Sequence, residues 1–524
     1  MNRGYPPEPH LSDQPLVRAS EGGARAQRWW FEILAAVGLA ALAAGFRAAY
    51  LGPPSLWVDD AWVTLVTKIH SLAEFRLVSQ TAPGFTALLK GCLGLAGFSE
   101  ANAQLLPFVF GIVTPAVAYI AFLTLGLRRL GAGTGALLLV VSPILITEST
   151  RVKQYTLDSL CSLVLLVLSI RLLDDVRSRR RWWALAITGV AALVLSSPSC
   201  VFLASGLGVG LLRLRRESRS SLTVACAPIL VAAASTVTWW SLVLRSANNE
   251  TLRRFWQGYF FTFVEGPAKG FLRTGRMTQD FFQSATPLPP YLGALLVVIA
   301  FAIVLRRRRF VGLLLTTPVA IAVFLAAIQY APLGTGRTDI YLYPALALVV
   351  GLAVEDIPAR ASWQRAIVVL ALSGWLLVGA AFGDIRKSYG YPEEDVRPLV
   401  AKAESIVPPS EALLIYHDTN FAFALYTTWP IRFVPTDTQP MGFQAPVQLP
   451  NVFTLEPHDK NPQAYAIVID RILRSYDVVW LAASHTQYRP GDFPYLETLL
   501  REHHLKRTVT YTWAGASLTR WSLR

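Results

Sequence analysis

Long runs of hydrophobic residues, separated by short polar loops, dominate this chain up to about residue 384. A run of about 20 apolar residues is long enough for a helix to cross a lipid bilayer. The pattern predicts a polytopic α-helical membrane protein with about eleven spans, at residues 29–51, 105–127, 132–147, 156–173, 183–196, 200–212, 222–244, 291–305, 310–330, 340–355 and 366–383. The runs 183–196 and 200–212 are short by this criterion, so this pair also fits a re-entrant hairpin.

Clusters of arginine predict the orientation of these helices. They occupy alternate loops of the scheme, at 128–129, 177–181, 213–219, 306–309 and 358–365. Cytoplasmic loops of membrane proteins carry an excess of Lys and Arg. We therefore expect these loops and the N-terminal tail 1–28 to be cytoplasmic. With an odd number of spans, residues 385–524 then lie outside the cell membrane.

The region 52–104 is the first predicted external loop. Its apolar segment 82–98 resembles a span, but counting it as one would invert every later loop. We therefore expect residues 59–75 and 82–98 to form helices along the outer membrane surface. Apolar residues at helical spacing in the first of them predict an interfacial amphipathic helix; they are Trp62, Val66, Ile69 and Ala73.

The second long external loop, 245–290, is basic, which is unusual for an external loop. Its cations are Arg245, Arg253, Arg254, Lys269, Arg273 and Arg276. Such cations either bind an anionic ligand or rest on anionic lipid headgroups. After residue 385 the pattern changes, and β-branched or aromatic runs alternate with helical ones. This change predicts a small external α/β domain.

The composition supports a membrane protein, since 53% of the 524 residues are hydrophobic and only 16% are charged, against about 25% charged in soluble proteins. The first apolar run is too long for a signal-peptide core of about 7–15 residues, so we expect it to remain as an anchor. The net charge of +14 comes from arginines in short loops, which does not indicate nucleic-acid binding. The four cysteines show no disulfide or zinc-binding spacing.

Two adjacent carboxylates, Asp59 and Asp60, stand at the start of the first external loop, in the stretch "SLWVDDAWVT". One interpretation makes one of them a general base that removes a proton from a hydroxyl group. Helix capping is the structural alternative, since Asp is a favoured N-cap residue. A divalent cation such as Mg²⁺ or Ca²⁺ would need further oxygen ligands. No cofactor is required by the sequence.

A second polar group lies in "TESTRVKQYTLDS", residues 147–159. Glu148, Arg151, Tyr155 and Asp158 are spaced by three, four and three residues, so on one helix they would share a face. If the helix begins near residue 150, Glu148 belongs to the preceding turn. Asp158 would lie about two turns inside the membrane, where a charge is costly and usually functional. The structural alternative is an ion pair of Arg151 with Asp158 or with Glu148.

Arg337, in the last external turn "GTGRTDIYLYP", is suited to binding a phosphate through charge-assisted hydrogen bonds. Lys153 is suited to the same task. The alternative for both is that the side chain only reaches the lipid headgroups. All three polar segments lie at the predicted external ends of helices, where they can converge on one cavity.

The order of these segments resembles the membrane glycosyltransferases of the GT-C superfamily, in particular the bacterial relatives of protein O-mannosyltransferases and lipid A aminoarabinose transferases. The matching segments are "WVDDA" (57–61), the surface helix beginning "APGFTALLK" (82–90), "SEANAQLLPFVFGIVTPAVAY" (99–119), "ESTRVKQYTLD" (148–158) and "GRTDIYLYPALAL" (336–348). Asp60 stands where the family often has Glu, and "TAPGF" (81–85) stands where it has Lys-Pro-Pro. The resemblance covers about residues 30–355.

The resemblance implies sugar transfer, with inversion, from a polyprenyl-phosphate donor to an acceptor hydroxyl at the outer face of a bacterial plasma membrane. The acceptor is a lipid, a glycan or a protein. Asp59 would be the general base, with Asp60 as its neighbour and substitute. Arg337, or else Arg151 or Lys153, would stabilise the phosphate. Glu148 and Asp158 would orient these groups or bind sugar hydroxyls, and Tyr155 would contact the sugar.

This resemblance divides the chain into a cytoplasmic tail (1–28), a transmembrane catalytic domain (29–384) and an extracytoplasmic domain (385–524). A transporter is the main alternative, although the acidic residues cluster on one side. A polysaccharide ligase, an acyltransferase and an inactive relative are the others. An acyltransferase would favour a membrane histidine as base, and His70 is the only histidine between residues 29 and 384.

Overall fold

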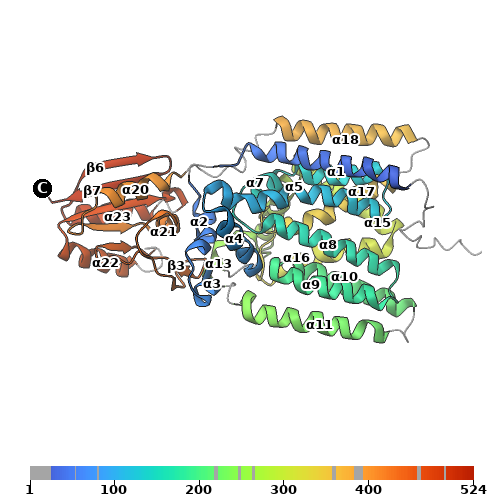
Figure 1. Cartoon of the computed structure of the whole chain (residues 1–524), viewed down its shortest axis with the longest axis horizontal. Helices are drawn as coiled ribbons and strands as arrows, with labels where there is room; N and C mark the ends of the chain where they lie inside the picture. Colours follow the sequence, from blue (N-terminus) through green and yellow to red (C-terminus); the bar gives the residue numbers. More distant parts are fainter. Residues whose placement is uncertain are drawn as a thin grey trace, which may run out of the picture.

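The computed structural model describes residues 25–523, apart from 53–54, 79–81, 218–221, 246–248, 262–265, 357–361, 383–393, 457–461 and 489–490. The molecule is elongated, with a bundle of long helices at one end and an α/β domain at the other (Figure 1). Short helices lie between the two parts. The N-terminal tail 1–24 lies outside the described residues.

A helix or a pair of helices occupies each of the eleven predicted spans. They are α1 (Arg25–Ala48), α5 (Glu100–Thr124), α6 (Arg129–Val141) with α7 (Pro143–Glu148), α8 (Tyr155–Asp174), α9 (Arg179–Leu195), α10 (Ser199–Glu217), α11 (Thr223–Trp239) with η3 (Trp240–Leu244), α15 (Pro290–Arg307), α16 (Arg309–Ala327), η5 (Ile340–Leu342) with α17 (Tyr343–Asp356), and α18 (Ser362–Phe382). Among the described residues, six helices are long and apolar enough to cross a membrane. The chain is a polytopic membrane protein.

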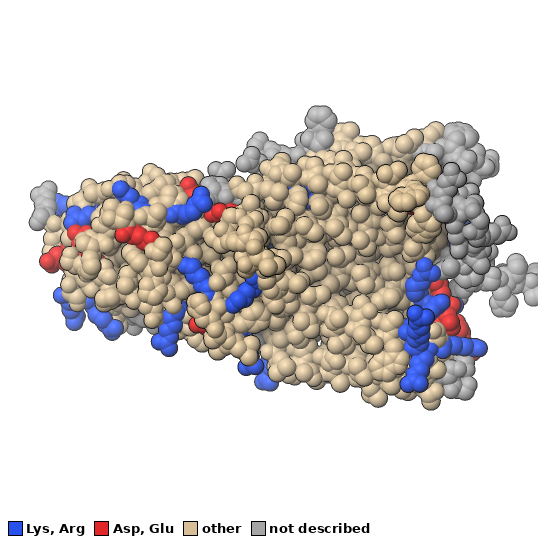
Figure 2. Space-filling view, viewed as in Figure 1, with Lys and Arg blue, Asp and Glu red and all other residues tan. Residues whose placement is uncertain are grey.

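The helices α9 and α10 are longer than their apolar cores suggested. They run along the bundle (Figure 1), α9 against α11 and α10 against α8 and α16. The interpretation of 183–196 and 200–212 as a re-entrant hairpin is therefore wrong. Figure 2 shows a side of the bundle with almost no charge, and basic side chains gathered at the end far from the α/β domain.

The helices between the two parts are α2 (Val58–Thr64), η1 (Leu65–Lys68), α3 (Leu72–Val78), α4 (Pro83–Ala96), α13 (Glu250–Phe255), η4 (Gln257–Tyr259) and α14 (Pro267–Ala285). The predicted continuous helix 59–75 is divided. Glu74 accepts hydrogen bonds from the backbone N–H of His70 (2.8 Å) and of Ser71 (3.1 Å), and the Ser71 hydroxyl accepts one from Glu74. This capping box begins a new helix, α3.

The division changes the surroundings of the predicted amphipathic face. Trp62, Val66 and Ile69 are buried, whereas Ala73 belongs to α3 and is exposed. Helix α2 packs against α21 (Asn420–Tyr426) of the α/β domain. The apolar face of α2 and η1 is therefore covered by protein, rather than by the lipid headgroups that the prediction of an interfacial helix required.

The α/β domain is built on a five-stranded sheet in the order β4-β1-β5-β7-β6. Its strands are β1 (Ala412–Ile415), β4 (Val452–Thr454), β5 (Val478–Ser484), β6 (Lys506–Trp513) and β7 (Ala516–Ser522), with a separate pair β2 (Val434–Pro435) and β3 (Phe443–Gln444). β4, β1 and β5 are parallel, and β7 and β6 continue the sheet antiparallel. Its other helices are α20 (Val396–Ile406), η6 (His417–Thr419), α22 (Pro462–Ser475), η7 (Thr486–Tyr488) and α23 (Asp492–Glu502). The predicted C-terminal α/β domain is confirmed.

Hydrogen bonds attach the α/β domain to the short helices on two sides. Lys68 donates to the backbone oxygens of Ala424 (2.8 Å) and Thr427 (2.6 Å). At a second point, the Thr251 hydroxyl of α13 donates to the backbone oxygen of Asp437 at 2.6 Å. Arg397 also forms an ion pair with Glu100 at 3.1 Å. The domain is therefore fixed over the end of the bundle, and it covers the space between these attachments.

Candidate active site

A cavity of about 910 Å³ lies between the end of the bundle and the α/β domain. Its walls come from α2, the turn between α7 and α8, α13, the loop before η5, and loops of the α/β domain. Six of the eight predicted site residues line it, namely Asp59, Glu148, Lys153, Tyr155, Asp158 and Arg337. Segments that are far apart in the sequence thus meet at one cavity. This is the arrangement expected from their predicted positions at the ends of helices.

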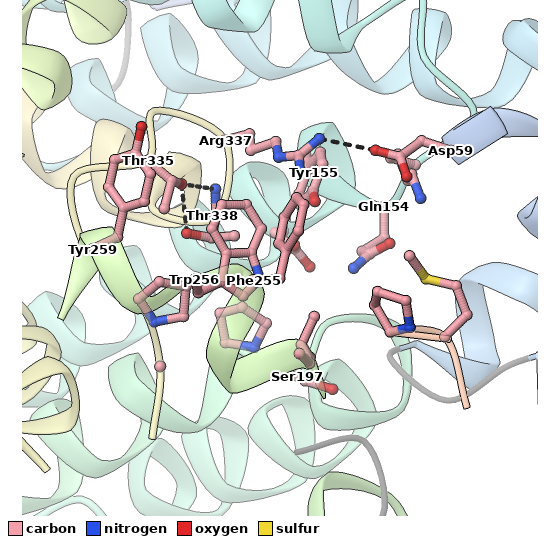
Figure 3. A pocket seen from close by; sticks show the side chains of 18 of the residues that line it. Asp59, Gln154, Tyr155, Ser197, Phe255, Trp256, Tyr259, Thr335, Arg337 and Thr338 are labelled. Carbon is pink, nitrogen blue, oxygen red and sulfur yellow. Dashed lines mark hydrogen bonds and ion pairs between the residues drawn. The ribbon is translucent and has the colours of Figure 1, made fainter. Parts of the chain in front are cut away.

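Asp59 and Arg337 form an ion pair at the cavity wall (Figure 3), with 2.9 Å between Oδ2 and Nη1. Both side chains are about one sixth exposed, at 17% and 16%. Burial by itself would raise the pKa of Asp59, but the positive charges of Lys153, Arg337 and Arg151 outweigh it and lower the pKa to about 2. Asp59 is therefore a carboxylate at neutral pH. The alternative that Arg337 only reaches headgroups is wrong, because its guanidinium turns towards Asp59.

Asp60 has a different environment from its neighbour. It is fully buried and forms an ion pair with Arg151, at 3.0 Å between Oδ2 and Nη1. Its other oxygen accepts a hydrogen bond from the backbone N–H of Val152 at 2.8 Å. The N-cap of α2 is Trp57, which makes no side-chain capping bond. The capping interpretation of the two carboxylates is therefore wrong, since both are used in ion pairs.

The observed ion pair of Arg151 also differs from the two ion pairs that the sequence spacing suggested. Arg151 pairs with Asp60, not with Glu148 or Asp158, and its guanidinium lies 5.0 Å from the ring centre of Trp57. The reason is local backbone structure: α7 ends at Glu148 and α8 begins only at Tyr155. The intervening turn carries Arg151 towards α2, so the four residues do not share one helical face. Glu148 instead belongs to the segment that precedes α8, as in the other of the two alternatives.

Glu148 and Asp158 line the cavity from the two ends of this turn. Asp158 lies in the first turn of α8. Both side chains are buried, and Glu148 Oε1 and Asp158 Oδ1 have no hydrogen-bond partner among the residues that the structure describes. Buried carboxyl oxygens without a partner are costly. These atoms suit a site that receives hydroxyl groups from a ligand.

Lys153 supplies a second positive charge beside Asp59. It is only 6% exposed, and its Nζ lies 3.9 Å from the ring centre of Trp62. Burial lowers the pKa of Lys153 to about 8, although the charges of Asp59 and Asp60 act in the opposite direction. Lys153 and Arg337 thus place two cations on one wall, which suits a phosphate.

The loop that carries Arg337 is held by Asp339. The Asp339 carboxylate is buried and accepts hydrogen bonds from the backbone N–H of Gly334 at 2.8 Å and from the hydroxyl of Thr338 at 2.8 Å. Gly334 and Gly336 have φ angles of +81° and +80°, which favour glycine. A Cβ on Gly336 would come 2.3 Å from the Ser284 hydroxyl of α14. The loop is therefore held by hydrogen bonds and packed tightly against α14.

Sequence reasoning missed the aromatic and C-terminal parts of the wall. The ring of Trp256, between α13 and η4, lies 4.9 Å from the Arg337 guanidinium, and Figure 3 shows it beside Phe255 and Tyr259. Of the cations in the loop 245–290, Arg253 lines the cavity. Gln439 and His485 line it from the α/β domain. No motif marks these residues, although the basic character of the loop 245–290 indicated an anionic ligand or surface nearby.

A metal site is not formed by these carboxylates in the described part of the chain. Asp59 and Asp60 face different arginines. No group of three or more His, Cys, Asp or Glu residues that could hold a metal ion occurs among the described residues. The positions around Asp59 are occupied by the cationic side chains Arg337 and Lys153.

Comparisons with solved structures identify relatives in fold. ArnT from Cupriavidus metallidurans in the apo state has a TM-score of 0.58 and 13% sequence identity, over 94% of this chain and 98% of that chain. The same protein bound to undecaprenyl phosphate has a TM-score of 0.56 and 14% identity over the same shares. This chain shares their fold. The oligosaccharyltransferase AglB from Archaeoglobus fulgidus, in complex with an inhibitory peptide and a dolichol-phosphate, has a TM-score of 0.52 and 13% identity, over 94% of this chain and 74% of that chain. No protein-family model and no curated protein sequence matches the chain.

Proposed function

We propose that this protein is an integral-membrane glycosyltransferase that moves a sugar from a polyprenyl-phosphate donor to an acceptor hydroxyl. One observation carries the proposal: the carboxylate of Asp59 lies in a large cavity next to two cations, Arg337 and Lys153. The similar structures add support, since ArnT was solved with undecaprenyl phosphate and AglB with a dolichol-phosphate.

The chemical step needs a base and a stabilised leaving group. Asp59 takes the proton from the acceptor hydroxyl, and the acceptor oxygen forms a bond to the anomeric carbon of the sugar. The bond between that carbon and the phosphate oxygen breaks, and the electron pair leaves with the polyprenyl phosphate. Arg337 and Lys153 stabilise the charge that develops on the phosphate. Attack from the face opposite the leaving group inverts the anomeric carbon.

The remaining residues have supporting roles in this proposal. Asp60 and Arg151 are positioning residues, because their buried ion pair joins the start of α2 to the turn that carries Lys153. Glu148 and Asp158 accept hydrogen bonds from sugar hydroxyls through the oxygens that lack partners among the described residues. Tyr155 contacts the sugar from the first residue of α8.

The site is proposed to work at the outer face of a bacterial inner membrane. The basic clusters at the far end of the bundle agree with a cytoplasmic location for that end. In this orientation residues 1–28 are a cytoplasmic tail, residues 29–384 the transmembrane catalytic domain and residues 385–524 the extracytoplasmic domain. The lipid donor then reaches the cavity from within the membrane.

The test is an assay with the purified full chain and its Asp59→Asn variant. Both are incubated with a panel of polyprenyl-phosphate sugars and crude envelope acceptors, and released polyprenyl phosphate is measured. We expect turnover by the wild type and a loss of roughly 10²-fold or more in the variant. Binding of undecaprenyl phosphate without turnover of any donor would favour an inactive relative. Absence of both would contradict the proposal.

A further inference from the structure

The roof of the cavity is formed by loops of the α/β domain that contain Asp418, Gln439 and His485. Asp418 lies in η6, directly after β1, and His485 directly follows β5. β1 and β5 are neighbouring parallel strands. Ligands of α/β domains bind at the carboxyl ends of such strands. The carboxyl ends of β1 and β5, where a ligand is expected to bind, thus face the cavity.

His485 is held in an unusual conformation at this edge. Its backbone φ is +62°, a region that non-glycine residues rarely adopt. Its Nδ1 lies 2.7 Å from a carboxylate oxygen of Glu394, which is also buried. The ring centre is 4.9 Å from that of Trp57, two residues before Asp59. Strained residues of this kind cluster at functional sites, and this one lies close to the proposed base.

Gln439 provides a second, independent observation. It is 3% exposed and lines the cavity, and its Nε2 has no hydrogen-bond partner among the described residues. The loop around it is attached to α13, where Asn249 donates a hydrogen bond to the backbone oxygen of Pro440 at 3.1 Å. A buried amide donor without a partner is costly. A bound ligand with a hydroxyl group would remove this cost.

The two sides of the cavity differ in charge. The cations that line it among the described residues, Lys153, Arg253 and Arg337, all come from the bundle and the helices next to it. The roof instead offers a carboxylate, an amide and an imidazole, with the carboxylate of Glu394 behind His485. An amide and a neutral imidazole each donate and accept hydrogen bonds, and an ionised carboxylate accepts them. They suit hydroxyl groups, whereas an anionic group would be repelled by the carboxylates.

We propose that this roof is the acceptor subsite, and that it binds a neutral glycan and presents one of its hydroxyl groups to Asp59. The inference rests on the proposed function, since it assigns the second substrate of the same cavity. The donor phosphate lies on the cationic wall, and the acceptor lies against the carboxylate, amide and imidazole groups of the roof. The two substrates therefore approach Asp59 from opposite sides.

The test measures both subsites in the full-length protein in lipid nanodiscs. The acceptor probes are neutral methyl hexosides and maltotriose, followed by saturation-transfer NMR, with glucose 6-phosphate and a neutral serine- and threonine-containing peptide as competitors. The donor probe is undecaprenyl phosphate. The variants are Gln439→Ala and His485→Gly, because glycine accepts the left-handed backbone. Matched controls are Gln448→Ala, an exposed glutamine, and His503→Ala, whose Nε2 lies 2.8 Å from Asp470 outside the cavity.

We expect a neutral saccharide to bind the wild type and both controls, and to bind each roof variant roughly threefold to tenfold more weakly, the loss expected for one hydrogen bond. Affinity for undecaprenyl phosphate should not change. Equal saccharide binding in all variants, no saccharide binding to the wild type, or tighter binding of the peptide or of glucose 6-phosphate at the roof would overturn the inference. If undecaprenyl phosphate fails to bind while the saccharide behaves as expected, the proposed function fails and the roof site stands.

Discussion

Asp59 and Arg337 are 278 positions apart in the sequence, yet their side chains meet at 2.9 Å in the cavity. The negative charge of Asp59, the proposed base, and the positive charge of Arg337, the proposed phosphate-binding residue, therefore balance each other before substrate binds. A phosphate that approaches Arg337 competes with Asp59 for the same guanidinium. Since the positive charges lower the pKa of Asp59 to about 2, withdrawal of Arg337 makes this carboxylate a stronger base. In the proposed mechanism we therefore expect donor binding to activate Asp59.

The first prediction separates the two adjacent carboxylates. Asp59→Asn should reduce sugar transfer by roughly 10²-fold or more, because it removes the base, while the protein stays folded. Asp60→Asn should instead lower the free energy of unfolding by roughly 3–5 kcal/mol, because it removes the charge of the fully buried Asp60 side chain from its ion pair with Arg151. Released polyprenyl phosphate and thermal unfolding are measured for both variants.

These two isosteric substitutions control for each other, since they remove the same charge at neighbouring positions. If Asp59→Asn unfolds the protein as much as Asp60→Asn does, the assignment of Asp59 to catalysis has no support from this comparison. Full activity of a folded Asp59→Asn variant would exclude it as the base and direct attention to Glu148 and Asp158.

The second prediction concerns the cation that binds phosphate. Arg337→Gln should weaken binding of undecaprenyl phosphate by roughly 10- to 100-fold, since a hydrogen bond to a charged group contributes about 1.5–3 kcal/mol. Arg254→Gln is the matched control, because Arg254 is 70% exposed and pairs with Glu250 on the surface of α13. Equal affinities of the two variants, measured by titration in nanodiscs, would show that Arg337 does not contact the phosphate.

The third prediction is a pH dependence set by Lys153. Burial lowers the pKa of this ammonium group to about 8. The charged form, which attracts phosphate, is present below that value and is lost as the pH rises through it. Affinity for undecaprenyl phosphate should therefore fall between about pH 7 and pH 9. Lys153→Arg should remove the fall, since arginine stays charged over this range. An unchanged pH profile in Lys153→Arg would assign the titration to another group.

The fourth prediction tests the loop that carries Arg337. Gly336→Ala places a Cβ at a φ of +80° and 2.3 Å from the Ser284 hydroxyl, so it should displace the loop and weaken donor binding. Gly275→Ala is the control, because this glycine lies within α14 with no atom within 4 Å of its added Cβ. Alanine in a helix interior is favoured by about 1 kcal/mol over glycine. We expect Gly275→Ala to keep the wild-type affinity, and equal loss in both variants would contradict the role of the loop.

Much of the fold could be predicted from the sequence. The apolar runs predicted the helices because a bilayer requires a long hydrophobic segment for each crossing. The alternation after residue 385 predicted the α/β domain. Asp59, Glu148, Lys153, Tyr155, Asp158 and Arg337 were selected as polar residues at the ends of helices, and all six line one cavity. These features could be predicted because they depend on the hydropathy and the chemical type of residues in short stretches of the sequence.

The tertiary structure decided the rest. Adjacent positions in the sequence, Asp59 and Asp60, differ because one faces the cavity and the other is buried against Arg151. The spacing of Glu148, Arg151 and Asp158 suggested one helical face, but the backbone turns between two helices there. Gln439 and His485 carry no motif and reach the cavity only because the α/β domain docks over the bundle. Such partnerships depend on contacts between residues far apart in the chain, and no local pattern records them.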